Sequence, residues 1–376
     1  MNFAFSEEQE ALRETVAQFL EQKSASADVR AQMETTEGFD ADVWKQMGAQ
    51  MGLPGLHIPE EFGGQGYSFV ELGIVLEEMG KRLLCAPYFA TVALAANAIL
   101  NAGSDSQKKE LLPGIAAGET IATLAFTEPS GQWDADGVAM TYEASGDGFT
   151  LSGEKMFVID GHTADLIVVV ARKAGSSGAD GLSFFTVAGD ASGLTRTALE
   201  TMDQTRKQAK LEFAGVAADL LGEEGAAGAA LSKTLDQAAV LLASEMVGGA
   251  QEVLDMSVAY AKERVQFGRP IGSFQAIKHK CADMLLEVES AKSAAYYAAW
   301  AAAEDNEELP VVASLAKAYC SDAYFHCAAE NIQIHGGIGF TWEHDAHLYF
   351  KRAKSAETYL GDATYHRELL AQRIGI

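Results

Sequence analysis

One acidic side chain stands out because it lies in an otherwise apolar stretch. Glu245 occurs within AAVLLASEMVGGA, where its neighbours are small or hydrophobic. A carboxylate that has lost its water takes up a proton more readily, as a general base must do. Gly248 and Gly249 follow one turn later and would leave room for a ligand. The alternative is a core glutamate that pairs with a lysine or arginine, or that faces another helix at a subunit interface.

A second set of residues has the chemistry to bind an anionic and partly aromatic ligand. Arg264 and Phe267 belong to the string RVQFGRPI, and Gln275 follows shortly after it. A guanidinium suits a pyrophosphate, and a phenylalanine ring offers a flat apolar face. In the alternative interpretation, Arg264 is a cation that the C-terminal end of a helix stabilises through its dipole.

Glycines in a third string would let the backbone approach a phosphate closely. Gln333, Gly336 and Gly337 lie in QIHGGIGF, and glycine has no Cβ to keep a ligand away. The alternative is an ordinary helix end. The histidines and acids of the following WEHDAH lack a further cysteine or histidine at ligand spacing, so no metal site is predicted.

Composition indicates a large folded chain of 376 residues, of which 48% are hydrophobic and 22% charged. The formal net charge of −25 disfavours nucleic acid as a partner, although local arginines and helix N-termini can still bind an anionic cofactor. No apolar run approaches the ~18–20 residues of a membrane span, and the N-terminal sequence lacks the features of a secretory signal. The four cysteines form no CxxC pair, which fits a reducing cytoplasm.

Three predicted domains would position these residues. Residues 1–118 are expected to form a helical domain, which opens with the capping-box spacing of Ser6 and Gln9. Residues 119–225 contain short runs rich in β-branched and aromatic residues between glycine turns, which predicts a small antiparallel β-barrel or sandwich. Residues 226–376 are expected to form a four-helix bundle, so the predicted fold class is α+β. Helices are expected over 70–80, 91–102, 231–265, 274–305 and 310–334.

The strings AFTEP, RVQFGRPI and QIHGGIGF follow one another on this helix–sheet–helix pattern. Together they resemble the acyl-CoA dehydrogenase family of flavoenzymes across essentially the whole chain. The resemblance implies FAD-dependent α,β-dehydrogenation of an acyl-CoA thioester in lipid β-oxidation, with removal of the α-proton by a carboxylate and hydride transfer to flavin N5. It also implies a homotetramer, or a heterotetramer with a related chain, and an electron-transfer flavoprotein as acceptor. The branch that the chain most resembles handles bulky or dicarboxylic esters, such as steroid side-chain and pimeloyl-CoA types.

Carried over residue by residue, the resemblance predicts FAD contacts in two parts of the chain. The middle-domain positions are Leu124, Phe126, Thr127, Trp133, Phe157 and Ile159. The C-terminal positions are Arg264, Phe267, Gln275, Gln333, Gly336, Gly337 and Asp362. Two middle-domain positions depart from the family: Ile159 lacks a hydroxyl for flavin N5, and Trp133 replaces a small residue that contacts flavin and thioester.

The family's usual positions for the catalytic base hold no carboxylate here. Its Tyr-Glu-Gly string is matched by YLG, in which Leu360 cannot take a proton. A less common position, near the start of the long helix, is occupied by alanine. Glu245 lies two turns further along that helix and is therefore predicted to be the base, with Asp362 as the remaining alternative. The competing function is a non-catalytic or half-site subunit of a heteromeric dehydrogenase, and a flavin oxidase ranks last.

Overall fold

The structure is a computed structural model that describes residues 5–146 and 148–376. Residues 1–4, with which the predicted N-terminal domain begins, lie outside the described residues. The chain divides into two compact units, and neither is a continuous stretch of sequence. The bundle unit contains Met1–Arg30, Phe69–Leu84 and Ala239–Ile376, and the sheet unit contains Ala31–Ser68 and Cys85–Ala238.

The first helix of the bundle unit, α1 (Glu7–Lys23), begins with the predicted capping box. The Ser6 hydroxyl accepts the Gln9 N–H at 3.2 Å, and the Gln9 side-chain oxygen accepts the Ser6 N–H at 2.9 Å. These reciprocal bonds satisfy two donors that a helix start leaves without backbone partners. The capped helix packs against α4 (Phe69–Lys81), which confirms the helix expected over 70–80.

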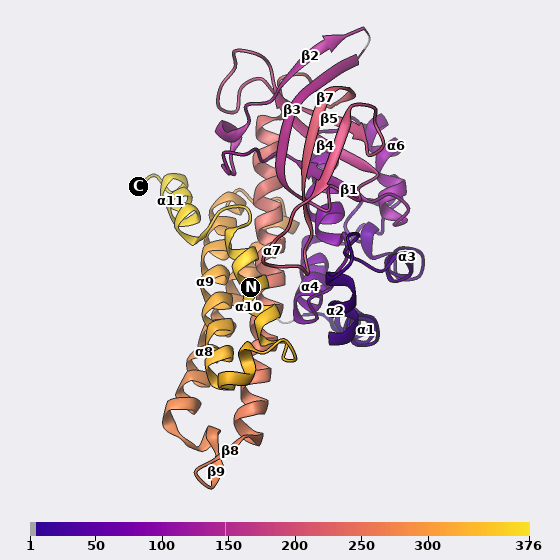
Figure 1. Ribbon diagram of the computed structural model, residues 1–376. Coiled ribbons are helices and arrows are strands. Elements are labelled where there is room, and N and C mark those ends of the chain that lie inside the picture. The colour runs from indigo at the N-terminus through magenta and orange to yellow at the C-terminus, as the bar shows by residue number, and fades with distance from the viewer. Residues whose placement is uncertain (1–4, 147) are drawn as a thin grey trace. The chain divides into compact units, whose positions relative to one another are not determined.

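Long helices dominate the C-terminal part of the chain. They are α7 (Ala227–Glu263), α8 (Gln275–Ala303), α9 (Leu309–His335), α10 (Ala346–Thr358) and α11 (Ala363–Arg373). The three long helices predicted from the hydrophobic pattern are confirmed, with small differences at their ends. Because α9 packs against α8, α10 and α11, it buries side chains on most of its faces, which its many alanines allow. Figure 1 shows the short hairpin of β8 (Val265–Gln266) and β9 (Arg269–Pro270) where α7 ends and α8 approaches.

The helices of the sheet unit are shorter, and one of them is of an unexpected type. The α-helices are α3 (Ala41–Ala49), α5 (Asn97–Ala102) and α6 (Asp105–Ala116), while α2 (Ser26–Met33) crosses the division between units. The helix predicted over 91–102 begins as a fully buried π-helix, η3 (Phe89–Ala96), that continues into α5. Thr91 joins η3 to the first strand, because its hydroxyl donates to Ala122 O at 3.1 Å and accepts from Ala122 N at 3.2 Å.

Seven strands form one sheet in the sheet unit. They are β1 (Ala122–Ala125), β2 (Thr141–Ser145), β3 (Gly148–Ile159), β4 (Leu166–Arg172), β5 (Leu182–Ala188), β6 (Leu194–Ala198) and β7 (Gln208–Leu221). Their order is β1-β4-β2-β3-β7-β5, with β6 on β7 and a further pairing of β4 with β5. The expectation of a wholly antiparallel sheet is wrong, because β1 runs parallel to β4 after a crossover through β2 and β3. Barrel closure stays a prediction.

The sheet buries one hydrophobic cluster, which includes Leu151, Val169, Phe185 and Leu211. β3 departs from regular pairing with β7 at two places, one of which lies between Lys155 and Val158. Bulges of this kind redirect a side chain locally. The α+β order of helices, sheet and helices is confirmed. Across the described residues, no helix combines the length and hydrophobicity that crossing a membrane requires.

Candidate functional site

The hairpin after α7 carries the arginine and phenylalanine of the predicted cofactor set. Arg264 directly follows the helix, and its N–H donates to Tyr260 O at 2.8 Å. The Arg264 carbonyl then accepts the Ile271 N–H at 2.8 Å, which closes the hairpin. Phe267 lies at the tip with a left-handed φ of 52°, and 92% of its surface is exposed. A large apolar ring held in solvent is typical of a surface that meets another molecule.

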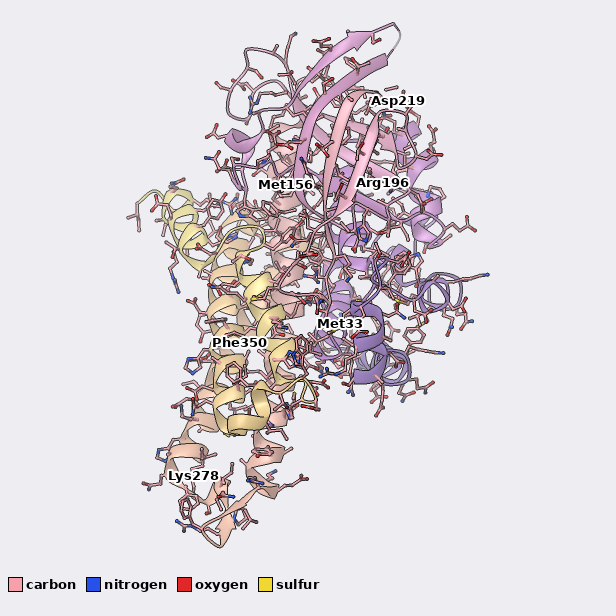
Figure 2. The ribbon with its side chains drawn as sticks, in the orientation of Figure 1. Met33, Met156, Arg196, Asp219, Lys278 and Phe350 are labelled. Carbon is pink, nitrogen blue, oxygen red and sulfur yellow. The ribbon has the colours of Figure 1, made fainter. Side chains whose placement is uncertain are left out.

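Residues at the start of α8 support this hairpin. Phe274 lies edge-on to Phe267 with ring centroids 6.1 Å apart, and the Arg269 guanidinium lies 4.1 Å from the Phe274 ring. Gln275 is the first residue of α8 and is exposed. Lys278, labelled in Figure 2, marks the next turn of the helix at this end of the bundle unit. The arginine, phenylalanine and glutamine of the predicted set are therefore close in the chain and open to solvent.

The end of α9 lies beside the end of α7. The rings of Tyr260 and His335 stack with centroids 4.3 Å apart, and Tyr260 is one turn before the hairpin. His335 separates Gln333 from Gly336 and Gly337, all three of which are exposed. Gly336 ends the helix with φ 63°, and a Cβ built on either glycine would meet nothing within 4 Å. The structure thus brings the ends of α7 and α9 together and leaves the backbone at Gly336 and Gly337 open.

The middle-domain positions of the set follow β1 and β3. Leu124 lies in β1, and Phe126 and Thr127 come directly after it; all three are buried. The Thr127 carbonyl accepts the N–H of Met156 at 2.9 Å, so these residues lie beside β3. Met156 is labelled in Figure 2, and the next residue, Phe157, has a left-handed φ of 58° at the bulge. The segments after β1 and at the end of β3 are therefore neighbours, and their contact with FAD stays a prediction.

Two further middle-domain positions differ in character from the open C-terminal set. Ile159 is buried at the end of β3, where its carbonyl accepts the Thr123 hydroxyl at 2.6 Å. Trp133 is half-buried, and its ring centroid lies 6.0 Å from that of Phe126 at an interplanar angle of 53°. Aromatic side chains rather than open backbone therefore occupy this part of the sheet unit.

A buried ion pair holds the segment after β1. The Lys155 ammonium donates to Glu128 Oε1 at 2.7 Å and to Phe126 O at 3.2 Å. Burial lowers the pKa of Lys155 to about 8, against the opposing effect of the Glu128 charge. Sequence reasoning did not identify this pair, although a lysine at an inward position of a strand was a signal.

Glu245 has a charged partner, so the expectation of a lone acid is wrong. Its Oε1 lies 3.0 Å from Nη1 of Arg352 on α10. Glu245 is 4% exposed and Arg352 is 2% exposed, so the pair is almost completely removed from water. A core glutamate paired with an arginine was one of the alternatives for this residue. Its role as a catalytic base stays a prediction.

The two glycines after Glu245 are used for helix packing. A Cβ on Gly248 would lie 1.8 Å from Glu77 O in α4, and one on Gly249 would lie 2.4 Å from the ring of Tyr324 in α9. These contacts fill the space that was expected to admit a ligand. That expectation is therefore wrong, and the glycines instead let α4 and α9 approach α7 closely.

The turn between α10 and α11 contains the other candidate base positions. Leu360 and Gly361 both have left-handed backbones, with φ of 62° and 97°. The buried Lys317 ammonium donates to Gly361 O at 2.8 Å, and burial lowers its pKa to about 7. The Asp362 carboxylate caps α11 by accepting the Tyr365 N–H at 2.8 Å. Its predicted contact with FAD stays a prediction.

Several buried cations in the described part of the chain were missed at the sequence level. Lys155, Lys317 and Arg352 each lie inside a unit and each hold a neighbouring segment in place. For Lys317 the signal was the same as for Glu245, namely one charge in an apolar helix. The partner of Glu245 could not be read from the sequence because Arg352 lies 107 residues away.

Known protein families account for nearly the whole chain. Family models described as the acyl-CoA dehydrogenase N-terminal, middle and C-terminal domains match residues 6–119, 123–216 and 223–375. The chain is 37% identical over 358 residues to the acyl-CoA dehydrogenase IpdE2 of Mycolicibacterium smegmatis, with 95% of each chain covered. The boundaries predicted at residues 118 and 225 stay predictions.

Solved structures give the same assignment. A variant of the Tcur3481–Tcur3483 steroid ACAD is 31% identical with a TM-score of 0.88, and 98% of each chain is covered. The ChsE4–ChsE5 complex from Mycobacterium tuberculosis is 27% identical with a TM-score of 0.89, covering 100% of this chain and 99% of the other. The similarity extends over the full length in each case.

Proposed function

Since the chain belongs to the acyl-CoA dehydrogenase family, whose members use FAD to dehydrogenate acyl-CoA, we propose that it forms one half of a shared site. Its partner would be a related but non-identical dehydrogenase chain. That partner contributes the flavin-binding sheet and the catalytic base, and this chain contributes its exposed C-terminal set.

The Glu245–Arg352 ion pair is the observation that carries this proposal. A base must accept a proton, and protonation of Glu245 would remove the charge that pairs with the buried Arg352 guanidinium at 3.0 Å. Breaking such a pair from one side costs about 3–5 kcal/mol. The remaining base position of the family is occupied by Leu360, which has no proton acceptor. Glu245 therefore fits a structural role better than a catalytic one.

The exposure of the C-terminal part of the predicted FAD set also supports this proposal. Arg264, Phe267 and Gln275 face solvent and have their backbone positions fixed by the hairpin and by α8. Residues arranged in this way suit a cofactor that is held mainly by another chain. The names of two similar structures, ChsE4–ChsE5 and Tcur3481–Tcur3483, each join two proteins, which supports an unlike pair for this chain.

The residues of the C-terminal set fit FAD chemically. Arg264 would pair with the pyrophosphate, the Phe267 ring would cover an aromatic face, and the open backbone at Gly336 and Gly337 would approach a phosphate. Bound FAD supplies a two-electron acceptor for the hydride that leaves the β-carbon. The chain's own residues would bind and orient the cofactor.

We propose a bulky or dicarboxylic acyl-CoA as the substrate of the assembly. Leucine at position 360 puts an apolar side chain where the family's carboxylate would lie, and one similar structure is named a steroid ACAD. An electron-transfer flavoprotein is the proposed electron acceptor, as the resemblance implies. Both proposals concern the complete assembly rather than this chain alone.

The second candidate is a self-sufficient homotetramer in which Glu245 removes the α-proton. It is favoured by the position of Glu245 on α7, where no other acid interrupts the apolar stretch from 238 to 250. The carboxylate would have to leave Arg352 before it could act. This requirement makes it the weaker of the two candidates.

The flavin content and mass of the chain separate the two candidates. The chain is purified alone, and also by a tag from cells that produce it naturally, and FAD per polypeptide and native mass are measured. A shared site predicts little FAD on the chain alone and one FAD per pair of unlike chains in the native assembly. A homotetramer with one FAD per chain would overturn the proposal.

A further inference from the structure

The loop after β1 carries Trp133, and Glu128 joins the two ends of this loop. The Glu128 carboxylate accepts the N–H groups of Ala139 at 3.0 Å and Met140 at 2.9 Å, and it pairs with Lys155 at 2.7 Å. Three charge-assisted bonds from one buried carboxylate join the two ends of the loop to each other and to β3. These bonds therefore hold both ends of the loop next to Phe126.

The far side of the same loop is held by the buried Arg172 at the end of β4. Its guanidinium donates to the carbonyls of Val138, Ala135 at 2.7 Å and Gly178 at 3.0 Å. Asp134, next to Trp133, caps a short turn by accepting the Asp136 N–H at 3.1 Å. These bonds fix the backbone of the loop before and after Trp133.

The indole lies beside Phe126, a position that the resemblance places against the flavin ring. Its centroid is 6.0 Å from that of the buried Phe126, and Thr127 is bonded to the strand that presents Phe157. An aromatic side chain covers roughly 150–250 Å² when it packs, far more than a small residue at the same place. A ring that packed on the same side of Phe126 would therefore meet the indole.

We propose that Trp133 is a built-in plug, which excludes the flavin ring and thioester from this chain's own middle-domain site. This inference rests on the proposed shared site and explains how the assembly would keep one FAD per unlike pair. The plug makes Trp133 a specificity-determining residue, because it decides which of two related sheets receives the cofactor. The missing hydroxyl at Ile159 removes a further attraction for flavin from the same site.

Replacement of Trp133 should change the FAD affinity in opposite directions, depending on whether the indole excludes the flavin or contacts it. If Trp133 is a plug, Trp133→Ser gains FAD affinity of at least tenfold in the isolated chain, and Trp133→Phe stays close to wild type. If Trp133 instead stacks on a bound flavin, Trp133→Ser loses affinity while Trp133→Phe keeps it. FAD fluorescence titration and absorbance after gel filtration measure both.

Two controls keep the experiment decisive. Circular dichroism and thermal unfolding check that each variant is folded, and Trp133→Leu provides a second smaller side chain if the serine variant aggregates. A wild-type chain that binds one FAD by itself would overturn both the plug and the shared site. An empty wild type with folded but empty Trp133→Ser and Trp133→Leu variants would overturn the plug alone. FAD uptake by either variant, with an empty wild type, supports the plug.

Discussion

The C-terminal and middle-domain parts of the predicted FAD set are in opposite physical states. Phe267 is 92% exposed at a hairpin tip, whereas Phe126 is 2% exposed and has Trp133 beside it. The glycines of the C-terminal set adjoin open space, while the loop of the middle set is closed by Glu128 and Arg172. The C-terminal region is open to solvent, whereas the middle-domain region is filled by its own side chains.

On the proposed assignment, a family motif persists at one half of a shared site and loses its role at the other. The arginine, phenylalanine and glycines need only a stable exposed backbone, which the hairpin and the end of α9 supply. A flavin site in the sheet also needs an empty volume and suitable hydrogen-bond donors. On this assignment, Trp133 fills the volume, and Ile159 lacks the hydroxyl that would donate a hydrogen bond.

The largest expected effect tests whether Glu245 has a structural or a catalytic role. We expect Arg352→Met to lower the free energy of unfolding by about 3–5 kcal/mol, because it removes one partner of a buried ion pair. The double variant with Glu245→Met should recover much of this loss. Urea unfolding of the two single variants and the double variant measures the coupling.

A matched control for that cycle is the i,i+3 pair of Lys354 and Glu357, which is 3.0 Å apart but partly exposed. Lys354→Met should change the free energy of unfolding by less than about 1 kcal/mol. Equal losses at the two pairs would remove the distinction between a buried structural pair and a surface one.

The next effect tests whether the exposed set binds FAD. In the native assembly, Arg264→Gln should weaken FAD about 10- to 100-fold, because a bond to a charged phosphate contributes about 1.5–3 kcal/mol. Titration of the flavin-free assembly with FAD, followed by fluorescence, measures this. Arg269→Gln in the same hairpin removes an equal charge that packs on Phe274, and should leave affinity nearly unchanged. Similar losses in both variants would indicate general electrostatics instead.

A smaller effect concerns the turn at Leu360, which Lys317 holds. The pKa of Lys317 is about 7 in the folded protein and 10.5 when unperturbed, so between these values the unfolded chain holds a proton that the folded chain has lost. Raising the pH from 7 to 9 should therefore stabilise wild type by about 1–2 kcal/mol relative to Lys317→Met. Unfolding midpoints at both pH values measure the difference. A Lys317→Met variant with the same pH slope as wild type would contradict it.

The smallest effect is expected at Ile159. Ile159→Thr restores a hydroxyl at a position that the resemblance places beside flavin N5, yet the assembly's flavin should keep its absorbance spectrum and its reduction potential. The reason is that the flavin of a shared site would rest on the partner's sheet. A shifted reduction potential in this variant would place the flavin against this chain's β3. It would contradict the view that only the C-terminal region of this chain meets the flavin.

Helices were more predictable than side-chain partners. The capping box of Ser6 and Gln9 and the long C-terminal helices follow from local spacing, which the sequence displays directly. The parallel pairing of β1 with β4 was missed because it joins strands that the chain separates by a hairpin. The π-helical turn of η3 was also missed, since a hydrophobic pattern does not distinguish it from an α-helix over so few residues.

The surroundings of the candidate site residues could not be predicted from the sequence. The sequence identified Glu245 as unusual, yet its meaning depended on Arg352, which the fold brings 3.0 Å from it. Gly248 and Gly249 were read as room for a ligand, whereas Glu77 and Tyr324 fill that space. Contacts between residues distant in sequence decided each case.

Substrate-driven bleaching of the flavin in a Glu245→Gln assembly tests the central claim most directly. Glutamine still accepts a hydrogen bond from Arg352 but cannot act as a base. The account predicts that the flavin-loaded assembly is bleached by its acyl-CoA at a rate close to wild type. Loss of bleaching by about 10²- to 10⁴-fold with FAD still bound would contradict it, because general-base catalysis contributes effects of that size.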